Sequence, residues 1–464
     1  MATGPDQAGE NVLCIQCDGR MFRAEKSVSH CYLSRVRASP FVTHRLNLMP
    51  TASRESRAPI SARTAFAILA LALGGFGIGA TEFAAMGMLP DFARELLPQL
   101  WAASEEQAIA QAGWLISLYA LGVVVGAPTI GAFAAKFPRR TLLLVFVATF
   151  VVGSVFTALL PNFELVLVSR FVAALCHGAY FGVAALVAAE LMGEGRQALG
   201  ISLVILGLTV SNMLGVPLIT WVAQLTNFRV AYLLIAGIFA ATFVAVYFVV
   251  PWQPGDKNAT IRRELAAFRR PQLWFALAMG AIGFGGLFAV YSYISPLVTD
   301  VAGLGEEVMP WTLFLFGAGM TVGTLIGGWL ADRGIRRAVM IGFAAMLLAQ
   351  TALWLWAGQG WVALPLLFFT GLAAQILAPT LQMRLISVSG DAQTMAATLV
   401  HSALNIGNSL GAFCGGLAIA AGWGYASAVL TGIALTVAGV CIAAVSFSIE
   451  RAGQRALGLA ATTL

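Results

Sequence analysis

Long apolar runs follow one another along most of this chain and constrain its fold more than any other feature. A helix of about 20 apolar residues crosses the roughly 30 Å hydrocarbon core of a bilayer. Hydrophobic residues make up 59% of the chain and charged residues only 10%, against about 25% charged in soluble domains. The sequence therefore predicts an all-α membrane protein with twelve transmembrane helices. We predict spans at 65–90, 112–134, 141–160, 164–190, 198–222, 230–250, 273–297, 310–331, 338–357, 362–383, 396–420 and 425–448.

The short connections between these runs alternate in charge. Arg and Lys gather in the connections at 136–140, 251–271 and 332–337, whereas acids gather at 91–106 and 300–307. Because Lys and Arg favour the cytoplasmic side, we expect the basic connections and both termini there. The net charge of +6 is thus explained by topology and indicates no nucleic-acid partner. We expect a multi-pass protein of the bacterial inner (plasma) membrane.

The first 62 residues differ from the rest. They lack the apolar segment of a signal peptide and any helical periodicity, which predicts a disordered cytoplasmic tail; Met49 is an alternative start. Cys14, Cys17 and His30 have part of a zinc-finger spacing, but no fourth ligand follows at a suitable distance. We therefore expect no metal and no cofactor.

The spans divide into two similar sets of six. Gly131–Arg140, after the second span, matches Gly328–Arg337, after the eighth, and Asn212–Gly215 matches Asn408–Gly411. Parallel repeats of this kind predict two pseudo-symmetric halves with a binding site between them. We predict five segments: the tail 1–62, the first half 63–250, a central cytoplasmic loop 251–271, the second half 272–450 and a cytoplasmic C-terminal tail 451–464.

One acid, Glu82, lies inside the first apolar run, and its counterpart in the second half is Phe288. An ionised carboxylate at that depth costs at least a few kcal/mol, so such an acid is usually neutral, paired or facing water. A protonated Glu that hydrogen-bonds a neighbouring helix is the structural alternative. The isolation of Glu82 makes it our first candidate for proton coupling.

Two further ionisable residues lie in the fourth predicted span. Arg170 is about seven residues from its start, and His177 is two helical turns farther on, on nearly the same face. A positive charge favours ionisation of a nearby acid, and His titrates near physiological pH. We therefore assign Arg170 and His177 with Glu82 to proton coupling. Snorkelling of Arg170 to the headgroups and simple packing of His177 are the alternatives.

Polar residues also recur along one face of the eleventh span. His401, Asn405 and Asn408 fall at i, i+4 and i+7, which indicates either cavity lining or interhelical hydrogen bonding. The other cavity candidates are Tyr180, Phe181, Asn212, Tyr291 and Gln375, with Tyr293, Ser295 and Gln382 as weaker ones.

The motif Gly-x-x-x-Asp-Arg-x-x-Arg-Arg at Gly328–Arg337 resembles the inner-loop signature of the major facilitator superfamily. Gly79–Phe83, Tyr119–Pro128, His177–Val183 and Ala403–Gly407 resemble its twelve-span drug:proton antiporters, especially arabinose efflux permeases and chloramphenicol exporters. The resemblance covers about residues 62–450 and implies export by alternating access. The gating residues it implies are Gly131, Lys136, Arg139, Arg140, Gly328, Asp332, Arg333, Arg336, Arg337, Gly207, Gly215 and Pro217.

The first inner loop departs from that signature. Ala135 stands where the family has Asp, and Pro138 where it has Gly. In the family this Asp helps latch the outward-facing state, so we expect the latch to be carried by Asp332 alone, or to be weaker. Ser211 and Asn212 also replace the Gly-Pro of the antiporter motif.

These features predict a transporter and not an enzyme. The chain has no Gly-x-x-x-x-Gly-Lys-Ser/Thr motif, so we expect an ion gradient to drive export of a drug- or sugar-like molecule in exchange for protons. The alternatives are a proton-coupled sugar or metabolite efflux permease, and a sensor that binds its ligand without moving it. The expected partners are the small-molecule substrate, protons and the lipid bilayer, and we expect a monomer.

Overall fold

The computed structural model describes residues 15–17, 20–22, 60–256 and 258–462. The chain forms two units, Met1–Pro59 and Ile60–Leu464. In the first unit, β1 (Ile15–Cys17) pairs antiparallel with β2 (Arg20–Phe22). This hairpin is a local exception to the predicted disordered tail, because Ile15 and Phe22, which lie opposite each other, are of types that favour strands. Cys14, His30 and Met49 lie outside the described residues.

The second unit is helical and begins with α1, whose N-terminus is capped by Ser61 through a bond from the Thr64 backbone N–H. Its first half comprises α1 (Ala62–Gly87), α2 (Leu89–Leu96), α3 (Pro98–Ala103), α4 (Glu105–Ala112), α5 (Trp114–Ala134), α6 (Arg139–Leu159), α7 (Phe163–Met192), α8 (Gln197–Val210), the π-turn η1 (Ser211–Gly215), α9 (Val216–Leu225) and α10 (Phe228–Val249).

A short helix α11 (Ile261–Leu265) and a 3₁₀ turn η2 (Ala266–Arg269) lie in the connection between the halves. The second half comprises α12 (Pro271–Ala278), η3 (Met279–Gly283), α13 (Gly285–Tyr291), α14 (Ile294–Pro296), η4 (Leu297–Val301), η5 (Glu306–Val308), α15 (Met309–Arg333), α16 (Ile335–Trp356), η6 (Gly360–Val362), α17 (Ala363–Gln375), α18 (Leu377–Val388), α19 (Gln393–Ala418), η7 (Ile419–Trp423) and α20 (Ser427–Thr462).

The fold is the all-α, twelve-span arrangement that the sequence predicts. Among the described residues, eleven helical stretches are long and apolar enough to cross a membrane. The twelfth span is α19, which has 26 residues but carries His401, Asn405 and Asn408; it packs against α5, α7 and α13. The alanine- and leucine-rich segment after residue 450, expected as a tail, continues α20 as helix to Thr462.

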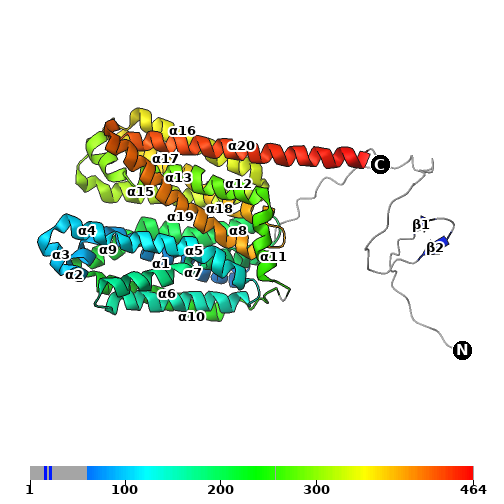
Figure 1. The fold of residues 1–464 in the computed structure, drawn as a ribbon, viewed down its shortest axis with the longest axis horizontal. Helices are drawn as coiled ribbons and strands as arrows, with labels where there is room; N and C mark the ends of the chain where they lie inside the picture. Colours follow the sequence, from blue (N-terminus) through cyan, green and yellow to red (C-terminus); the bar gives the residue numbers. More distant parts are fainter. Residues whose placement is uncertain (1–14, 18–19, 23–59, 257, 463–464) are drawn as a thin grey trace. The chain divides into compact units, whose positions relative to one another are not determined.

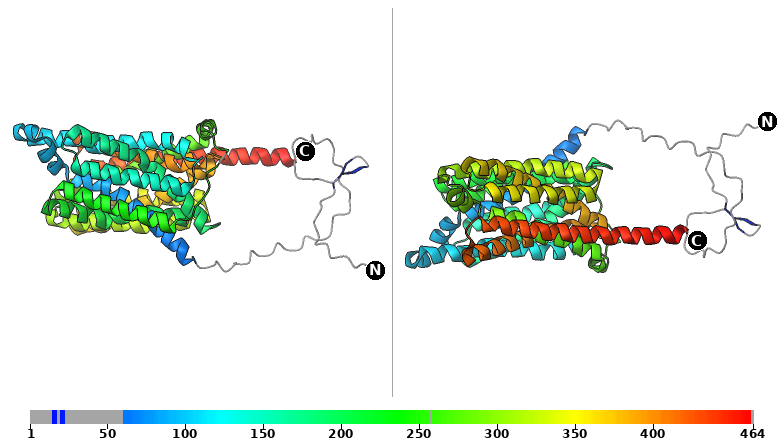
Figure 2. Two further views of the ribbon diagram at one scale, coloured as in Figure 1. Left: turned by 90° about the horizontal axis from the view of Figure 1, so that it is seen from below. Right: turned by 90° about the horizontal axis from the view of Figure 1, so that it is seen from above.

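The two halves form separate bundles that lie side by side (Figures 1 and 2). Each has its own hydrophobic core, one drawn from residues 67–250 and the other from 267–447 with Ala132 added. Because the apolar side chains of each core are packed within their own half, the surface between the halves can carry polar groups.

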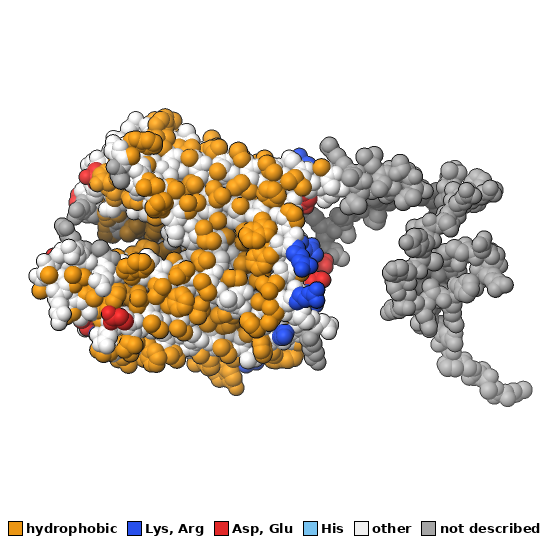
Figure 3. All heavy atoms as spheres, viewed as in Figure 1, with side chains coloured by type: hydrophobic (Ala, Val, Ile, Leu, Met, Phe, Trp, Pro, Cys, Tyr) orange, Lys and Arg blue, Asp and Glu red, His pale blue; other side chains and the backbone are white. Residues whose placement is uncertain are grey.

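The two ends of the helical unit differ in charge and in closure. Arg and Lys cluster at the end next to α11, here called the basic end, whereas acids lie at the end bearing α2–α4, the acidic end (Figure 3). At the basic end the halves touch closely: a methyl group on Gly131 would overlap Thr398 of α19, and one on Gly328 would overlap Ser202 of α8. Toward the acidic end, Figure 3 shows the face hollowed between the halves.

Candidate functional site: a buried acid beside a central cavity

Glu82 meets two other titratable side chains inside the first half. Its side chain is 10% exposed, and its Oε2 lies 3.9 Å from Nδ1 of His177 on α7. The hydroxyl of Tyr119, on α5, is 3.1 Å from the same nitrogen. The first half therefore brings a carboxyl, an imidazole and a phenol from three helices into one buried cluster.

Arg170 lies beside this cluster and does not snorkel to the membrane surface. Its side chain is 2% exposed, and its Nε donates to the Leu115 carbonyl at 3.1 Å. One Nη donates to the Thr81 carbonyl at 3.3 Å, and the other donates to the Tyr232 hydroxyl. The guanidinium is thus held next to Glu82 through the backbone of the preceding residue.

Tyr119 and Tyr232 enclose Arg170. Tyr119 begins the stretch Tyr119–Pro128 that resembles the antiporters, but neither tyrosine was predicted as a site residue. The guanidinium carbon is 5.1 Å from the centre of the Tyr119 ring and 5.6 Å from that of Tyr232, within the range of cation–π attraction. Tyr119 therefore contacts both Arg170 and His177. An aromatic residue in an apolar span is unremarkable in sequence, so only its neighbours in space reveal this position.

A cavity of about 60 Å³ lies between the two halves, with Glu82 and His177 on its wall. Ligand sites for drug-sized molecules are roughly 300–1,000 Å³, so this conformation is closed around the centre. Its apolar and aromatic lining is formed by Phe83, Ile205, Leu208, Phe284, Leu287, Phe288, Tyr291, Phe316, Met320, Ala378 and Leu404. The remaining polar lining is formed by Asn212, Gln375, Gln382, His401, Asn405 and Asn408.

Many of these polar groups have buried atoms without a hydrogen-bond partner in the described part of the chain. They are Oδ1 of Asn212 and Asn405, Oε1 of Gln375 and Gln382, and Nε2 of His401. A buried polar atom left unpaired costs about 1–3 kcal/mol. The lining is therefore suited to a molecule that supplies hydrogen-bonding groups as well as apolar surface.

Local breaks in the helices help to expose these groups. Asn212 lies in η1, where a π-turn interrupts the fifth span ahead of Pro217 in α9. π-turns of this kind occur often at functional sites. Gly207, four residues before the break, packs directly on Ala72 of α1, and Gly215, the last residue of the break, packs on Phe76.

The structure places nine predicted residues on the cavity wall and two of the main cavity candidates elsewhere. Those on the wall are Glu82, His177, Asn212, Tyr291, Gln375, His401, Asn405, Asn408 and the weaker candidate Gln382. Tyr180 instead donates to the Leu71 carbonyl at 2.8 Å, and Phe181 stacks on His401 with ring centres 4.4 Å apart. Neither residue lines the cavity in this conformation, because their helix face is covered by α1 and α19. The weaker candidate Tyr293 is also elsewhere, since its hydroxyl donates to the Ala412 carbonyl.

The two copies of the inner-loop motif make different contacts at the basic end. Asp332 accepts the backbone N–H groups of Ala198 and Leu199 at 2.8 and 3.0 Å, in the first turn of α8 in the other half. Arg139 pairs with Glu190 at 2.6 Å, and Arg140 donates to the Tyr247 carbonyl. Lys136 and Arg337 are exposed.

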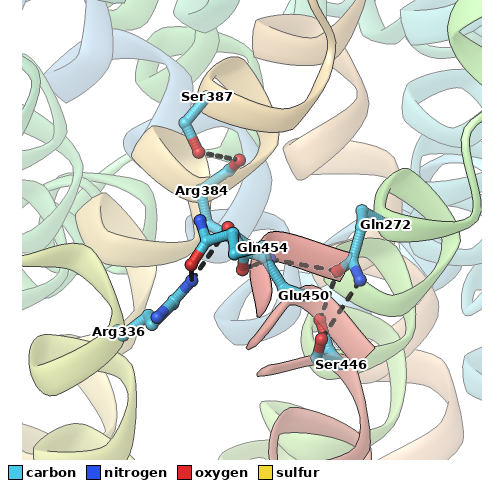
Figure 4. A network of polar contacts seen from close by, with 7 residues as sticks. All are labelled: Gln272, Arg336, Arg384, Ser387, Ser446, Glu450 and Gln454. Carbon is cyan, nitrogen blue, oxygen red and sulfur yellow. Dashed lines mark hydrogen bonds and ion pairs between the residues drawn. The ribbon is translucent and has the colours of Figure 1, made fainter. Parts of the chain in front are cut away.

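In the second half, Glu450 of α20 joins three helices (Figure 4). It pairs with Arg336 of α16 at 3.2 Å and with the buried Arg384 of α18 at 2.9 Å. Gln272 of α12 accepts from Arg384 and from Ser446. Arg333 stacks on the Trp329 ring at 3.5 Å. Arg333 and Arg336 thus make contacts within the second half, whereas the side chain of Asp332 reaches across to the first.

Comparison with known proteins agrees with this architecture. The family model described as Major Facilitator Superfamily matches residues 71–389 and 303–461. The chain is 35% identical to the inner membrane transport protein YdhP of Escherichia coli (strain K12), covering 80% of this chain and 94% of that one. It is 32% identical to the putative transporter AraJ of the same strain, covering 77% and 89%.

A chloramphenicol resistance protein of Streptomyces lividans is 30% identical, with 79% of this chain and 94% of that protein covered. The solved proton:xylose symporter XylE has the same fold, with a TM-score of 0.69 at 16% identity, covering 84% of this chain and 96% of that one. The predicted resemblance to the arabinose and chloramphenicol efflux proteins is confirmed. This chain belongs to the major facilitator superfamily of membrane transporters.

Proposed function

We propose that the protein exports an uncharged, amphipathic small molecule by alternating access, in exchange for protons, with Glu82 as the coupling acid. The observation that carries this proposal is the central cavity, whose wall holds one buried acid among aromatic and unpaired polar groups.

The proton-coupling part rests on the surroundings of Glu82. The acid lies at the cavity wall and 3.9 Å from His177, so a proton can pass between water in an opened cavity and the buried cluster. Arg170 is fixed beside it by two backbone carbonyls. A small shift of α1 relative to α7 would change the distance between the two charges, and with it the preference for the ionised form.

The substrate class rests on the rest of the lining. Glu82 is the one formally charged side chain among the residues that line the cavity, which favours an uncharged substrate. Phe83, Phe288 and Phe316 offer aromatic surface, and the unpaired amides of Asn405 and Gln375 offer hydrogen bonds. Similarity to a chloramphenicol resistance protein supports a substrate that combines a ring with hydroxyl and amide groups.

A sugar is the second candidate, and the unpaired amides favour it. Hydroxyl groups donate readily to amide oxygens such as those of Gln375 and Gln382, whereas the many aromatic side chains favour the amphipathic molecule.

The orientation in the membrane follows from the distribution of charge. We place the basic end in the cytoplasm by the positive-inside rule, so the hollowed acidic end faces outward.

Everted membrane vesicles with an imposed pH gradient test the proposal. Wild type, Glu82→Gln and the matched control Glu105→Gln, an exposed acid at the acidic end, are compared for uptake of chloramphenicol and of a pentose. We expect wild type and Glu105→Gln to accumulate one of them, and a protonophore to abolish this. Glu82→Gln should lose the proton-driven accumulation, because an amide cannot take up and release the exchanged proton. Equal accumulation by Glu82→Gln would remove Glu82 as the coupling acid.

A further inference from the structure

The internal repeat places Asp332 and Ala135 at matching positions in the two inner loops. Asp332 satisfies two backbone N–H groups in the first turn of α8, across the interface between the halves. A helix N-terminus leaves such groups unpaired and attracts a carboxylate. By the same repeat, an acid at position 135 would serve the first turn of α19, and Ala135 has no side chain to do so.

The first turn of α19 nevertheless has a carboxylate partner, and it comes from the connection between the halves. Oε2 of Glu264, in α11, accepts the backbone N–H of Met395 at 3.2 Å. The residue that precedes α19, Ala392, provides no side-chain cap. Glu264 is only 2% exposed although it lies in a predicted loop, so its side chain is committed to this contact.

The segment that carries Glu264 is fixed to the inner loop of the first half. The Arg139 N–H donates to the Gln253 carbonyl at 3.1 Å, and the Asp256 N–H donates to the Ala135 carbonyl at 2.8 Å. The helix α11 then contacts both α5 of the first half and α19 of the second. Glu264 therefore reaches α19 from a support that belongs to the first half.

A small cavity adjoins Ala135 at the basic end. It measures about 50 Å³ and is lined by Ala135, Arg139 and Asp256 on one side and by Thr394, in the first turn of α19, on the other. The inner loop thus approaches the helix terminus as it does in the second half, but without a carboxylate of its own.

We infer that Glu264 replaces the missing aspartate as the latch between the first half and α19, and thereby favours the conformation that is closed at the basic end. The inference rests on alternating access, as in the proposed function, but on neither the substrate nor Glu82. It makes the central connection part of the gate.

Distance measurements between spin labels test this latch in the full chain. The six native cysteines are replaced, and labels are placed at Glu194 and Ser387, which are exposed at the basic end on opposite halves. Double electron–electron resonance then measures the distances between the two labels. These distances give the populations of the conformations that are closed and open at the basic end. The variants are Glu264→Ala, Glu264→Gln, Glu264→Ala with Ala135→Asp, and the control Asp391→Ala, an exposed acid just before α19.

We expect Glu264→Ala to raise the ratio of open to closed populations by roughly tenfold, the effect typical of losing a helix cap. Glu264→Gln keeps an acceptor oxygen and should resemble wild type, as should Asp391→Ala. Restoring the acid with Ala135→Asp should return the Glu264→Ala populations toward wild type, which a merely structural role for Glu264 would not explain.

Two outcomes separate failure of this inference from failure of the proposed function. If wild type shows both populations and Glu264→Ala leaves their ratio unchanged, or Ala135→Asp gives no rescue, Glu264 is not the latch. If no variant changes between two states with pH or substrate, alternating access itself is contradicted. Monodispersity and thermal unfolding identify any variant that fails to fold, in which case Glu264→Gln and Ala135→Asp in the wild-type background carry the comparison.

Discussion

Arg170 and Glu82 share a site without sharing a hydrogen bond in the described structure. The guanidinium donates to the carbonyls of Thr81 and Leu115 and to the Tyr232 hydroxyl. A bidentate pair with Glu82 would hold the carboxylate ionised, whereas a coupling acid has to take up and release its proton. Directing the donors of Arg170 to backbone carbonyls keeps a positive charge near Glu82 and leaves the carboxyl able to change its protonation.

Tyr119 gives the first prediction at this scale. Tyr119→Phe keeps the ring against Arg170 but removes the hydroxyl that contacts Nδ1 of His177. Leaving that buried nitrogen unpaired costs about 1–3 kcal/mol, so we expect slower proton-driven transport and a shifted pH–rate profile in vesicles. Tyr180→Phe is the control, because it removes a buried hydroxyl that bonds Leu71 away from the cavity. Matching pH–rate profiles for Tyr119→Phe and wild type would contradict a role for Tyr119.

Individual residues differ in how far sequence alone could place them. Glu82, Arg170 and His177 stand out because charge is costly in an apolar span, and the structure brings them together. Helical spacing gave the face on which Tyr180 lies, but it says nothing about which neighbour covers that face, and α1 covers it. Glu264 was missed because an acid in a charged loop is ordinary in sequence.

At the scale of elements, the length of an apolar run predicts a helix. It does not predict where that helix is interrupted. The run at 198–222 predicted one span, whereas the structure has α8, η1 and α9. The extra residue of a π-turn depends on packing against α1, where Gly207 and Gly215 allow close approach. Likewise, α19 is too polar for a hydropathy criterion and is recognised as a span by its place in the repeat and its contacts.

Asp332 caps the first turn of α8, and its substitution gives the prediction for a helix terminus. Asp332→Ala removes both acceptors from the first turn of α8, and a lost cap costs about 0.5–2 kcal/mol. We expect the population open at the basic end to increase, with Asp332→Asn intermediate because it keeps one oxygen. The same spin-label distances measure this. If wild type, Asp332→Ala and Asp332→Asn gave the same distance distribution, the cap would not influence opening at the basic end.

At the scale of the whole molecule, few polar contacts join the halves near the basic end. Thr398 donates to the Ala127 carbonyl at 2.9 Å, and Ser402 donates to the Val124 carbonyl at 3.1 Å. Because each half keeps its own core, the halves can rock apart by exchanging such contacts without unpacking either core. The sequence predicts the two halves through the repeat. It cannot predict which end is closed, since the same residues serve both conformations.

The gate should also respond to pH through Glu264. Burial raises the pKa of Glu264 above its ordinary value, although the Met395 N–H and Arg263 oppose this and Asp256 adds to it; Asp391 faces Arg263 from the start of α19. An acid whose pKa is higher in the closed form binds its proton more tightly there. The protonated Glu264 carboxyl therefore stabilises the closed form fully at pH values below its ordinary pKa. This stabilisation is lost as the pH rises through the raised pKa of the closed form.

We therefore expect the population closed at the basic end to increase as pH falls through the mildly acidic range. Spin-label distances are measured across pH in the Glu82→Gln background, so that the coupling acid does not contribute. Adding Glu264→Gln should flatten the response while keeping the closed form populated, because the amide oxygen still accepts from Met395. A pH response that survives in the double variant would assign it to another group, and one of opposite sign would show that the ionised carboxylate is the stronger latch.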